Sequence, residues 1–249
     1  MRLRRFSFAL ILLCLAALPA DAQRYYDNGR NAPSHYEAPY DGQFAFVRLF
    51  YDHYPGWSYD YPDMEENLLS ILTKITNMGA TEKGRNILHM DDPAIFKYPV
   101  AYISEPGYWY PTDADVRNLR EYIQKGGFLI IDDFHYENEW AVFEAAIKRV
   151  LPEGKIVPLD VKHPIFNTFF QIPTLHIPYP GNLGQRGLFG EFYGIHQDND
   201  PSKPLNVVID YNMDIGDYME YSGSGFYLVD PSNEAFKLMI NYIVYGHTR

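Results

Sequence analysis

Two adjacent carboxylates follow a wholly apolar run in the middle of the chain and are the first candidates for chemistry. Asp132 and Asp133 directly follow the run Phe128-Leu129-Ile130-Ile131. Such a run is typical of a buried parallel strand, and ligands of doubly wound α/β sheets bind beyond the carboxyl ends of these strands. Because neighbouring strand residues point to opposite faces, we expect one carboxylate to bind a cation or a hydroxyl-bearing ligand in a cleft while the other caps a loop. The alternative is that both only accept hydrogen bonds from backbone amides.

Four further side chains are candidates for the same site. Glu105 follows another apolar strand, although the sequence Glu105-Pro106-Gly107-Tyr108 also suits a simple turn. His163 precedes a proline, and it either serves as a base or ligand near neutral pH or packs within a loop. Trp57 and Trp109 fall in loops after the first and third strands, where rings can stack on a sugar or a partner side chain. The predicted ligand-binding residues are therefore Glu105, Asp132, Asp133, His163, Trp57 and Trp109.

The sequence predicts no metal site and no cofactor. Asn212 to Asp217 alternates acidic residues like a calcium loop, but it lacks the glycine register and the distant glutamate of such a loop. We interpret it as a solvated turn beside the last strand. The stretch 173–204 is predicted to be irregular. The spacing of its candidate metal ligands matches no known metal-binding motif; these residues are His176, His196, Asp198 and Asp200.

The elements that must position these side chains alternate between strand and helix. The helix over 112–126 opens with the capping pattern Thr112-Asp113-Ala114-Asp115 and ends at Gly126-Gly127, and the helix over 63–79 opens with Asp63-Met64-Glu65-Glu66. This alternation indicates one α/β domain over 44–249, a doubly wound, mostly parallel sheet flanked by helices. The remaining helices are predicted at 138–152, capped by Asn138, and at 230–246, and the strands at 44–51, 87–88, 99–103, 128–131, 155–159 and 206–209.

The N-terminal residues indicate export. Residues 1–22 have a basic start, an apolar centre and a small-residue cleavage site, which together are typical of a secretory signal peptide. Residues 23–43 read as a flexible spacer. We therefore expect a periplasmic or secreted protein without stable membrane insertion, and the one cysteine, Cys14, leaves with the signal peptide. The formal net charge of −11 argues against binding to nucleic acid or to anionic membranes.

From 44 to 245 the chain resembles the bacterial domain-of-unknown-function family 4159, regarded as a variant of the class I glutamine amidotransferase-like fold, which is flavodoxin-like. Order and spacing carry the resemblance, not any single motif. The motifs are Phe46-Val47-Arg48 with Tyr51-Asp52, Tyr61-Pro62 with Glu66-Asn67-Leu68, Asp91-Asp92-Pro93, Glu105-Pro106-Gly107, Leu119-Arg120, Gly126-Gly127-Phe128, Asp132-Asp133, Trp140, His163-Pro164-Ile165-Phe166, Asn212 to Asp217, and Asn241.

Catalytic amidotransferases of this fold carry a cysteine on a tight turn after a comparable strand, roughly where Asp132 to Phe134 fall. Because this chain has no cysteine there, the resemblance implies the fold without the ammonia-releasing activity, and no catalytic residue is assigned. We expect a non-catalytic module of the cell envelope that binds a small ligand or partner. Two alternatives stay open. One is a carboxylate- or metal-assisted hydrolase acting on an exported glycan or peptide, with Asp133 or Glu105 as the base and His163 as helper; the other is a structural subunit of an envelope assembly.

Overall fold

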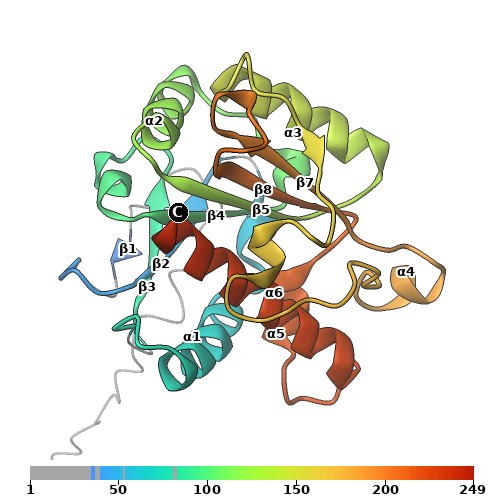
Figure 1. Cartoon of the computed structure of the whole chain (residues 1–249). Helices are drawn as coiled ribbons and strands as arrows, with labels where there is room; N and C mark the ends of the chain where they lie inside the picture. The colour runs from blue at the N-terminus through green and yellow to red at the C-terminus, as the bar shows by residue number, and fades with distance from the viewer. Residues whose placement is uncertain (1–34, 37–39, 53, 81–82) are drawn as a thin grey trace, which may run out of the picture.

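The computed structural model describes residues 35–36, 40–52, 54–80 and 83–249. Within these residues one sheet runs through the middle of the molecule with helices on both faces (Figure 1). The proposed signal peptide and most of the proposed spacer lie outside the described residues. The sheet has eight strands in this part of the chain: β1 (His35–Tyr36), β2 (Phe46–Phe50), β3 (Arg85–His89), β4 (Val100–Ser104), β5 (Phe128–Phe134), β6 (Val157–Pro158), β7 (Glu191–His196) and β8 (Leu205–Tyr211).

The strand order is β1-β3-β2-β4-β5-β8-β7-β6. The five central strands, β3, β2, β4, β5 and β8, pair in parallel, whereas β1, β7 and β6 join antiparallel at the two sides. The strands β2, β4 and β5 are buried on both faces, which is why their sequences are largely apolar instead of alternating. The predicted mostly parallel α/β sheet flanked by helices is confirmed.

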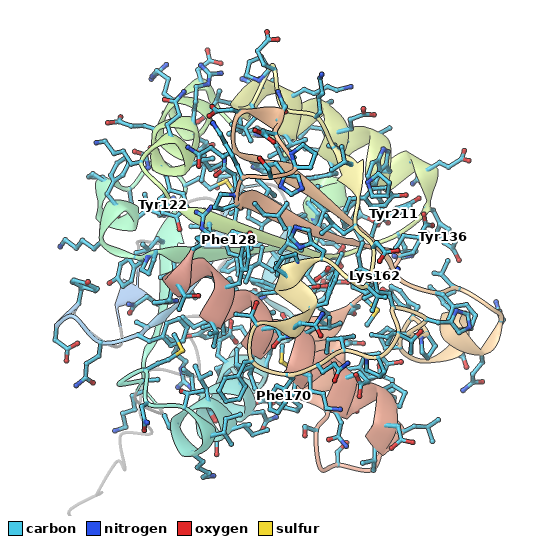
Figure 2. All side chains as sticks on the ribbon, viewed as in Figure 1. Tyr122, Phe128, Tyr136, Lys162, Phe170 and Tyr211 are labelled. Carbon is cyan, nitrogen blue, oxygen red and sulfur yellow. The ribbon has the colours of Figure 1, made fainter. Side chains whose placement is uncertain are left out.

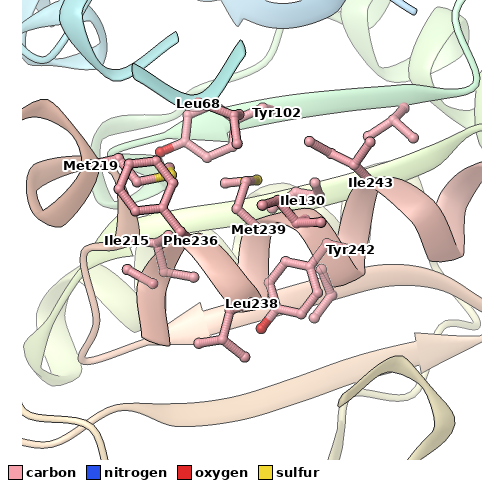
Figure 3. Close-up of a cluster of buried hydrophobic side chains, with 14 of the residues drawn as sticks. Leu68, Tyr102, Ile130, Ile215, Met219, Phe236, Leu238, Met239, Tyr242 and Ile243 are labelled. Atoms are coloured by element: carbon pink, nitrogen blue, oxygen red, sulfur yellow. The ribbon is translucent and has the colours of Figure 1, made fainter. Parts of the chain in front are cut away.

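Each face of the sheet is covered by its own set of helices (Figure 1). The helices α2 (Asp113–Gln124) and α3 (Tyr136–Val150) cover one face. The other face is covered by α1 (Asp63–Ile75), α5 (Ile215–Glu220) and α6 (Val229–Thr248). In the core of that second face, Figure 3 shows Tyr102 and Ile130 of the sheet against Met239 and Ile243 of α6. Burial of such apolar side chains is the main force that holds the layers together.

Four local expectations need correction. Glu191–His196 forms the strand β7 inside the stretch that the sequence predicts to be irregular. This strand is stabilised by its pairing with β8, and the local sequence carries no clear signal for it. The helix α1 begins after Pro62 without a side-chain cap, so the expected capping box at Asp63 does not form. Asn138 lies inside α3, whose N-cap is His135. Within the spacer, β1 pairs with β3.

Other boundaries agree with the sequence. Thr112 and Asp115 form the predicted capping box at the start of α2, and Gly126, at a φ of 98°, follows the end of that helix. The helix α6 begins one residue before the predicted start and ends near the predicted Gly246. The short helix α4 (Asn182–Gln185) lies in the long connection between β6 and β7.

Asn241 fixes part of that connection to the core. Its fully buried side chain accepts hydrogen bonds from the backbone N–H groups of Phe169 and Phe170, at 3.0 and 2.7 Å, and donates to the carbonyl of Phe170 at 2.8 Å. We expect Asn241→Ala to lower the free energy of unfolding by about 2–4 kcal/mol, because two backbone N–H groups and one carbonyl, all partly buried, lose their hydrogen-bond partner. Denaturant unfolding measures this loss. Asn167→Ala is the control, since the exposed Asn167 makes one bond of 3.4 Å, and an equal loss in both variants would contradict the assignment.

Candidate functional site

Acidic side chains gather where the central strands end. Glu105 directly follows β4, Asp132 and Asp133 lie near the end of β5, and Asp214 and Asp217 stand at the start of α5, which follows β8. Because parallel strands end at the same edge, these positions are neighbours in space, and the carboxylates raise one another's pKa values. We call these five residues the acidic cluster.

Asp132 connects β5 to α5. Its side chain is fully buried and accepts hydrogen bonds from the Tyr102 hydroxyl at 3.0 Å and from the backbone N–H groups of Ile215 and Gly216 at 3.0 to 3.1 Å. Burial raises the pKa of Asp132 to about 7, although these hydrogen bonds favour the charged form and limit the shift. The side chain therefore has the amide-bonded, structural arrangement that was the alternative interpretation of the doublet.

Asp133 takes a different direction because the backbone leaves the regular strand there. Its φ of 64° is left-handed, and the register of β5 against β8 shifts between Ile131 and Phe134. The half-buried side chain accepts a hydrogen bond from the Ser104 hydroxyl at 3.2 Å. Burial, followed by the charge of Glu105, raises the pKa of Asp133 well above its usual range. The structure thus gives the two aspartates different surroundings through a change of backbone conformation.

Glu105 stands beside a pair of stacked tyrosines. The rings of Tyr54 and Tyr108 are nearly parallel with centroids 3.9 Å apart, and the Tyr54 hydroxyl lies 3.4 Å from Oε1 of Glu105. The backbone of Glu105 makes the predicted turn, since its carbonyl accepts from the N–H of Tyr108, and it also accepts from the Tyr51 hydroxyl at 2.6 Å. Burial, followed by the charge of Glu139, raises the pKa of Glu105 to about 8. At neutral pH Glu105 is therefore protonated in most molecules.

Left-handed backbone is concentrated at this edge. Glu105, Asp133, Tyr136 and Asn212 have φ values of 55°, 64°, 64° and 52°, and none of them is glycine. A side chain in this conformation costs roughly 1–3 kcal/mol, and such residues are frequent at active sites and ligand clamps. Surrounding contacts hold them in place: the N–H of Tyr136 donates to Oδ1 of Asn212 at 3.1 Å.

A cavity of about 540 Å³ opens at the same edge. It lies between the start of α3 and the end of β8, and Figure 2 shows two of its residues, Tyr136 and Tyr211, next to each other. The first residue of the cavity wall, Tyr136, follows Asp133 by three positions in the chain. Its lining consists of Tyr136, Glu137, Asn138, Leu188, Tyr211 and Asn212, which together we call the edge cavity.

Tyr179, in the long connection between β6 and β7, lies close to the acidic cluster. Burial raises the pKa of its hydroxyl, and so do the nearby charges of Asp214, Asp133 and Asp217. Its ring also contacts the ring of His135, with centroids 5.2 Å apart. Sequence reasoning missed Tyr179, because nothing in an irregular segment indicates which part of it folds back over the sheet.

A buried ion pair network lies beside the cluster. Arg48 of β2 is fully buried and forms a double hydrogen bond to Asp60, at 2.8 and 3.0 Å, and a third bond to Glu65 at 2.7 Å. It also donates to the carbonyl of Trp57 at 2.8 Å. Because Asp60 and Glu65 form ion pairs with Arg48, the charge of Arg48 does not neutralise the acidic cluster. A charged residue inside the run Phe46-Val47-Arg48-Leu49-Phe50 was the one signal that could have revealed this network from the sequence.

Three predicted site residues lie elsewhere or are covered. His163 is at the opposite edge of the parallel strands: its ring lies 5.4 Å from that of His196, which pairs with Leu205 at the beginning of β8. The structure thus corrects the expected position of His163 beside the doublet, because the segment after β6 folds back toward the strand beginnings. The rings of Trp57 and Trp109 are 6% and 0% exposed, so neither offers the open stacking face that was expected. Trp57 packs edge-on against Phe50.

Within the described ranges, no three histidine, cysteine, aspartate or glutamate side chains converge closely enough to hold a metal ion. None of the helices in the described residues is both long and apolar enough to cross a bilayer.

The molecule is thus an α/β protein with clustered acidic residues and neighbouring tyrosines at the carboxyl edge of a mostly parallel sheet. Residues 44–246 match the family model described as Domain of unknown function (DUF4159), and the chain belongs to this family. A comparison with curated proteins found no match.

Proposed function

We propose that the chain is a non-catalytic binding module whose acidic cluster and edge cavity hold a ligand that carries a positively charged organic group. The observation that supports this most directly is an excess of carboxylates over cations at this edge. Glu105 and Asp133 have raised pKa values. Arg48, the cation of the neighbouring network, is already paired with Asp60 and Glu65. A bound cation would stabilise the charged form of these carboxylates.

The tyrosines around the cluster support the same ligand. Cations are attracted to the faces of aromatic rings, and the stacked pair of Tyr54 and Tyr108 stands directly beside Glu105. Tyr179 adds a third ring on the side of Asp133. A cavity of about 540 Å³ falls within the range that small ligands occupy.

The proposal includes a finer assignment of the fold. Among the parallel strands the order β3-β2-β4-β5-β8 corresponds to 2-1-3-4-5 in chain order, the order of flavodoxin-like sheets, and this supports a class I glutamine amidotransferase-like relationship. Near the end of β5, roughly where an amidotransferase would carry its cysteine, this chain has Asp132-Asp133-Phe134. The missing nucleophile supports binding over acyl transfer. In keeping with residues 1–22, we place the module in the periplasm or outside the cell.

The test compares benzylammonium with the neutral benzyl alcohol by calorimetric titration of the purified protein. We expect benzylammonium to bind and its affinity to rise about twentyfold from pH 6.5 to pH 8.5, because Glu105, with a pKa of about 8, must lose its proton to pair with the cation. Asp133→Asn and Glu105→Gln should each weaken binding about tenfold or more. Asp113→Asn is the control, since Asp113 is an exposed carboxylate at the start of α2. Equal affinity for the alcohol, or no dependence on pH, would contradict the proposal.

One observation favours hydrolysis as the second candidate. A Glu105 carboxyl that keeps its proton at neutral pH beside Asp133 resembles the acid half of a general acid and base pair. Turnover of a glycan or peptide that disappears in Asp133→Asn while benzylammonium still binds would favour this candidate over the binding module.

A further inference from the structure

The connection between α5 and α6 carries exposed apolar side chains. Phe226, Leu228 and Val229 are 69%, 77% and 71% exposed. Tyr221, directly after α5, is also exposed, and the whole connection lies below α5 in Figure 1. Connections between helices are usually polar, and neighbouring exposed apolar side chains mark interaction sites. We call Tyr221, Phe226, Leu228 and Val229 the apolar patch.

The apolar patch has a fixed shape. Gly223 and Gly225, with φ values of 75° and 78°, turn the chain, and Ser224 between them closes the turn. Its hydroxyl donates to the carbonyl of Tyr221 at 2.6 Å and accepts from the N–H of Phe226 at 3.1 Å. The rings of Tyr221 and Phe226 pack together with centroids 4.8 Å apart. A surface that is already ordered loses little conformational freedom when a partner binds.

The base of the apolar patch is tied to the body of the molecule. The Tyr227 hydroxyl donates to Oδ2 of Asp217 on α5 at 2.7 Å. Asn67 of α1 donates to the carbonyls of Met219 and Glu220, at 2.9 and 3.0 Å, and so connects the end of α5 to α1. The patch is therefore a supported surface, and not a loose loop.

The surroundings of the apolar patch are acidic. From 213 to 236 the sequence has no lysine or arginine but has five acidic residues, which are Asp214, Asp217, Glu220, Asp230 and Glu234. Asp230 directly follows Val229 and is exposed. On the side of α5, the charge of Glu220 is the main cause that raises the pKa of Tyr221, and the charges of Asp217 and Asp63 add to it. An apolar surface with an acidic rim is complementary to a surface that combines apolar and basic side chains.

Charge argues against the two other occupants of an exposed apolar surface. In a symmetric dimer one patch would meet its own copy, so the two acidic rims would face each other. The net charge of −11 adds repulsion between copies at longer range. An anionic membrane surface is repelled for the same reason.

We infer that the apolar patch docks a protein segment that carries apolar and basic side chains. Phe226 and Leu228 become buried in this contact, and the basic groups face Asp230 and Glu220. An amphipathic basic helix is one form of such a segment. The inference adds a protein partner to a chain whose proposed ligand is small, and it does not depend on the edge cavity.

The test titrates the purified protein into a fluorescein-labelled helical peptide with leucine on one face and lysine on the other, and follows fluorescence anisotropy. Two matched peptides change one property each: glutamate replaces lysine in the first, and serine replaces leucine in the second. We expect the leucine and lysine peptide to bind saturably, and both matched peptides to bind about tenfold more weakly or worse. In an ¹⁵N-labelled sample, the amide signals of Gly223 and Gly225 should shift as the first peptide binds.

Because a basic peptide is attracted to any acidic protein, variants of the apolar patch decide the result. Phe226→Ser combined with Leu228→Ser should weaken binding of the leucine and lysine peptide about tenfold or more, because two apolar side chains are lost from the contact. Asp230→Asn should weaken it about threefold at low salt. Tyr110→Ser is the matched control and should leave the affinity unchanged, since it removes a 61% exposed ring outside the patch. Circular dichroism confirms that each variant is folded.

The inference is overturned if the folded double variant binds the leucine and lysine peptide as well as the parent protein does, or if the glutamate peptide binds equally well. It is also overturned if sedimentation equilibrium shows a dimer that the double variant no longer forms, because the patch then belongs to a contact between two copies. Binding of phosphatidylcholine vesicles by the parent protein, but not by the double variant, would overturn it in favour of lipid.

Discussion

Arg48→Met is expected to destabilise the protein more than any other single change considered. The methionine fills much of the volume but leaves Asp60 and Glu65 without the guanidinium that bonds to both of them. Removing one partner of a buried ion pair typically costs about 3–5 kcal/mol, because an uncompensated buried charge remains. Burial already raises the pKa of Glu65 to about 7 in the presence of Arg48. Denaturant unfolding should show a lower midpoint with an unchanged slope.

A triple variant separates the charge effect from packing. In Arg48→Met combined with Asp60→Asn and Glu65→Gln, no buried charge remains, and we expect most of the lost stability to return. If the triple variant is as unstable as Arg48→Met alone, the shape of Arg48 and its bond to the Trp57 carbonyl matter more than its charge. Full stability of Arg48→Met would show that the network contributes nothing.

Stability is expected to fall as the pH rises from about 5 to about 8. Asp132 and Glu105 have folded-state pKa values of about 7 and about 8, and burial raises that of Asp210 well above its usual range. Unfolded carboxyl groups titrate near pH 4, so the folded protein holds more protons between these values, and its free energy of unfolding decreases with pH. Below about pH 4 both states are protonated and the contribution is complete. With a shift of roughly three units, Asp132 alone contributes on the order of 4 kcal/mol across this window.

Asp210 provides the control for this pH dependence. It is fully buried on β8, level with Asp132 on the neighbouring strand, and one carboxylate oxygen accepts from the Tyr242 hydroxyl at 2.9 Å while the other has no hydrogen-bond partner. Asp210→Asn keeps an oxygen for Tyr242 and removes the titration. We expect this variant to be more stable than the parent at pH 8 and to lose less stability between pH 5 and pH 8. Thermal unfolding at several pH values measures both effects, and a parent stability that is flat or rises over this range would sink the prediction.

The candidate site shows which residue positions local sequence can predict and which it cannot. The doublet Asp132-Asp133 and the position of Glu105 could be placed at the carboxyl edge, because an apolar run that ends in an acid has few other interpretations in a parallel sheet. The prediction of a solvated turn over Asn212 to Asp217 is wrong. Asn212 and Asp214 are buried, and Asp214 caps α5 by accepting from the N–H of Asp217 at 2.7 Å. Hydrophilic composition alone cannot distinguish a solvated turn from a polar segment that other chain segments cover.

The sequence by itself determined the elements with a strong local signal: the buried strand β5, the capped helix α2 and the apolar helix α6. Their periodicity and caps act over a few neighbouring residues, so they can be recognised without the rest of the chain. Only the tertiary structure decided that Tyr179 lies close to the acidic cluster, that His163 lies at the far edge and that Trp109 is buried. These positions depend on how long connections fold back across the sheet, and that is set by contacts between residues far apart in the chain.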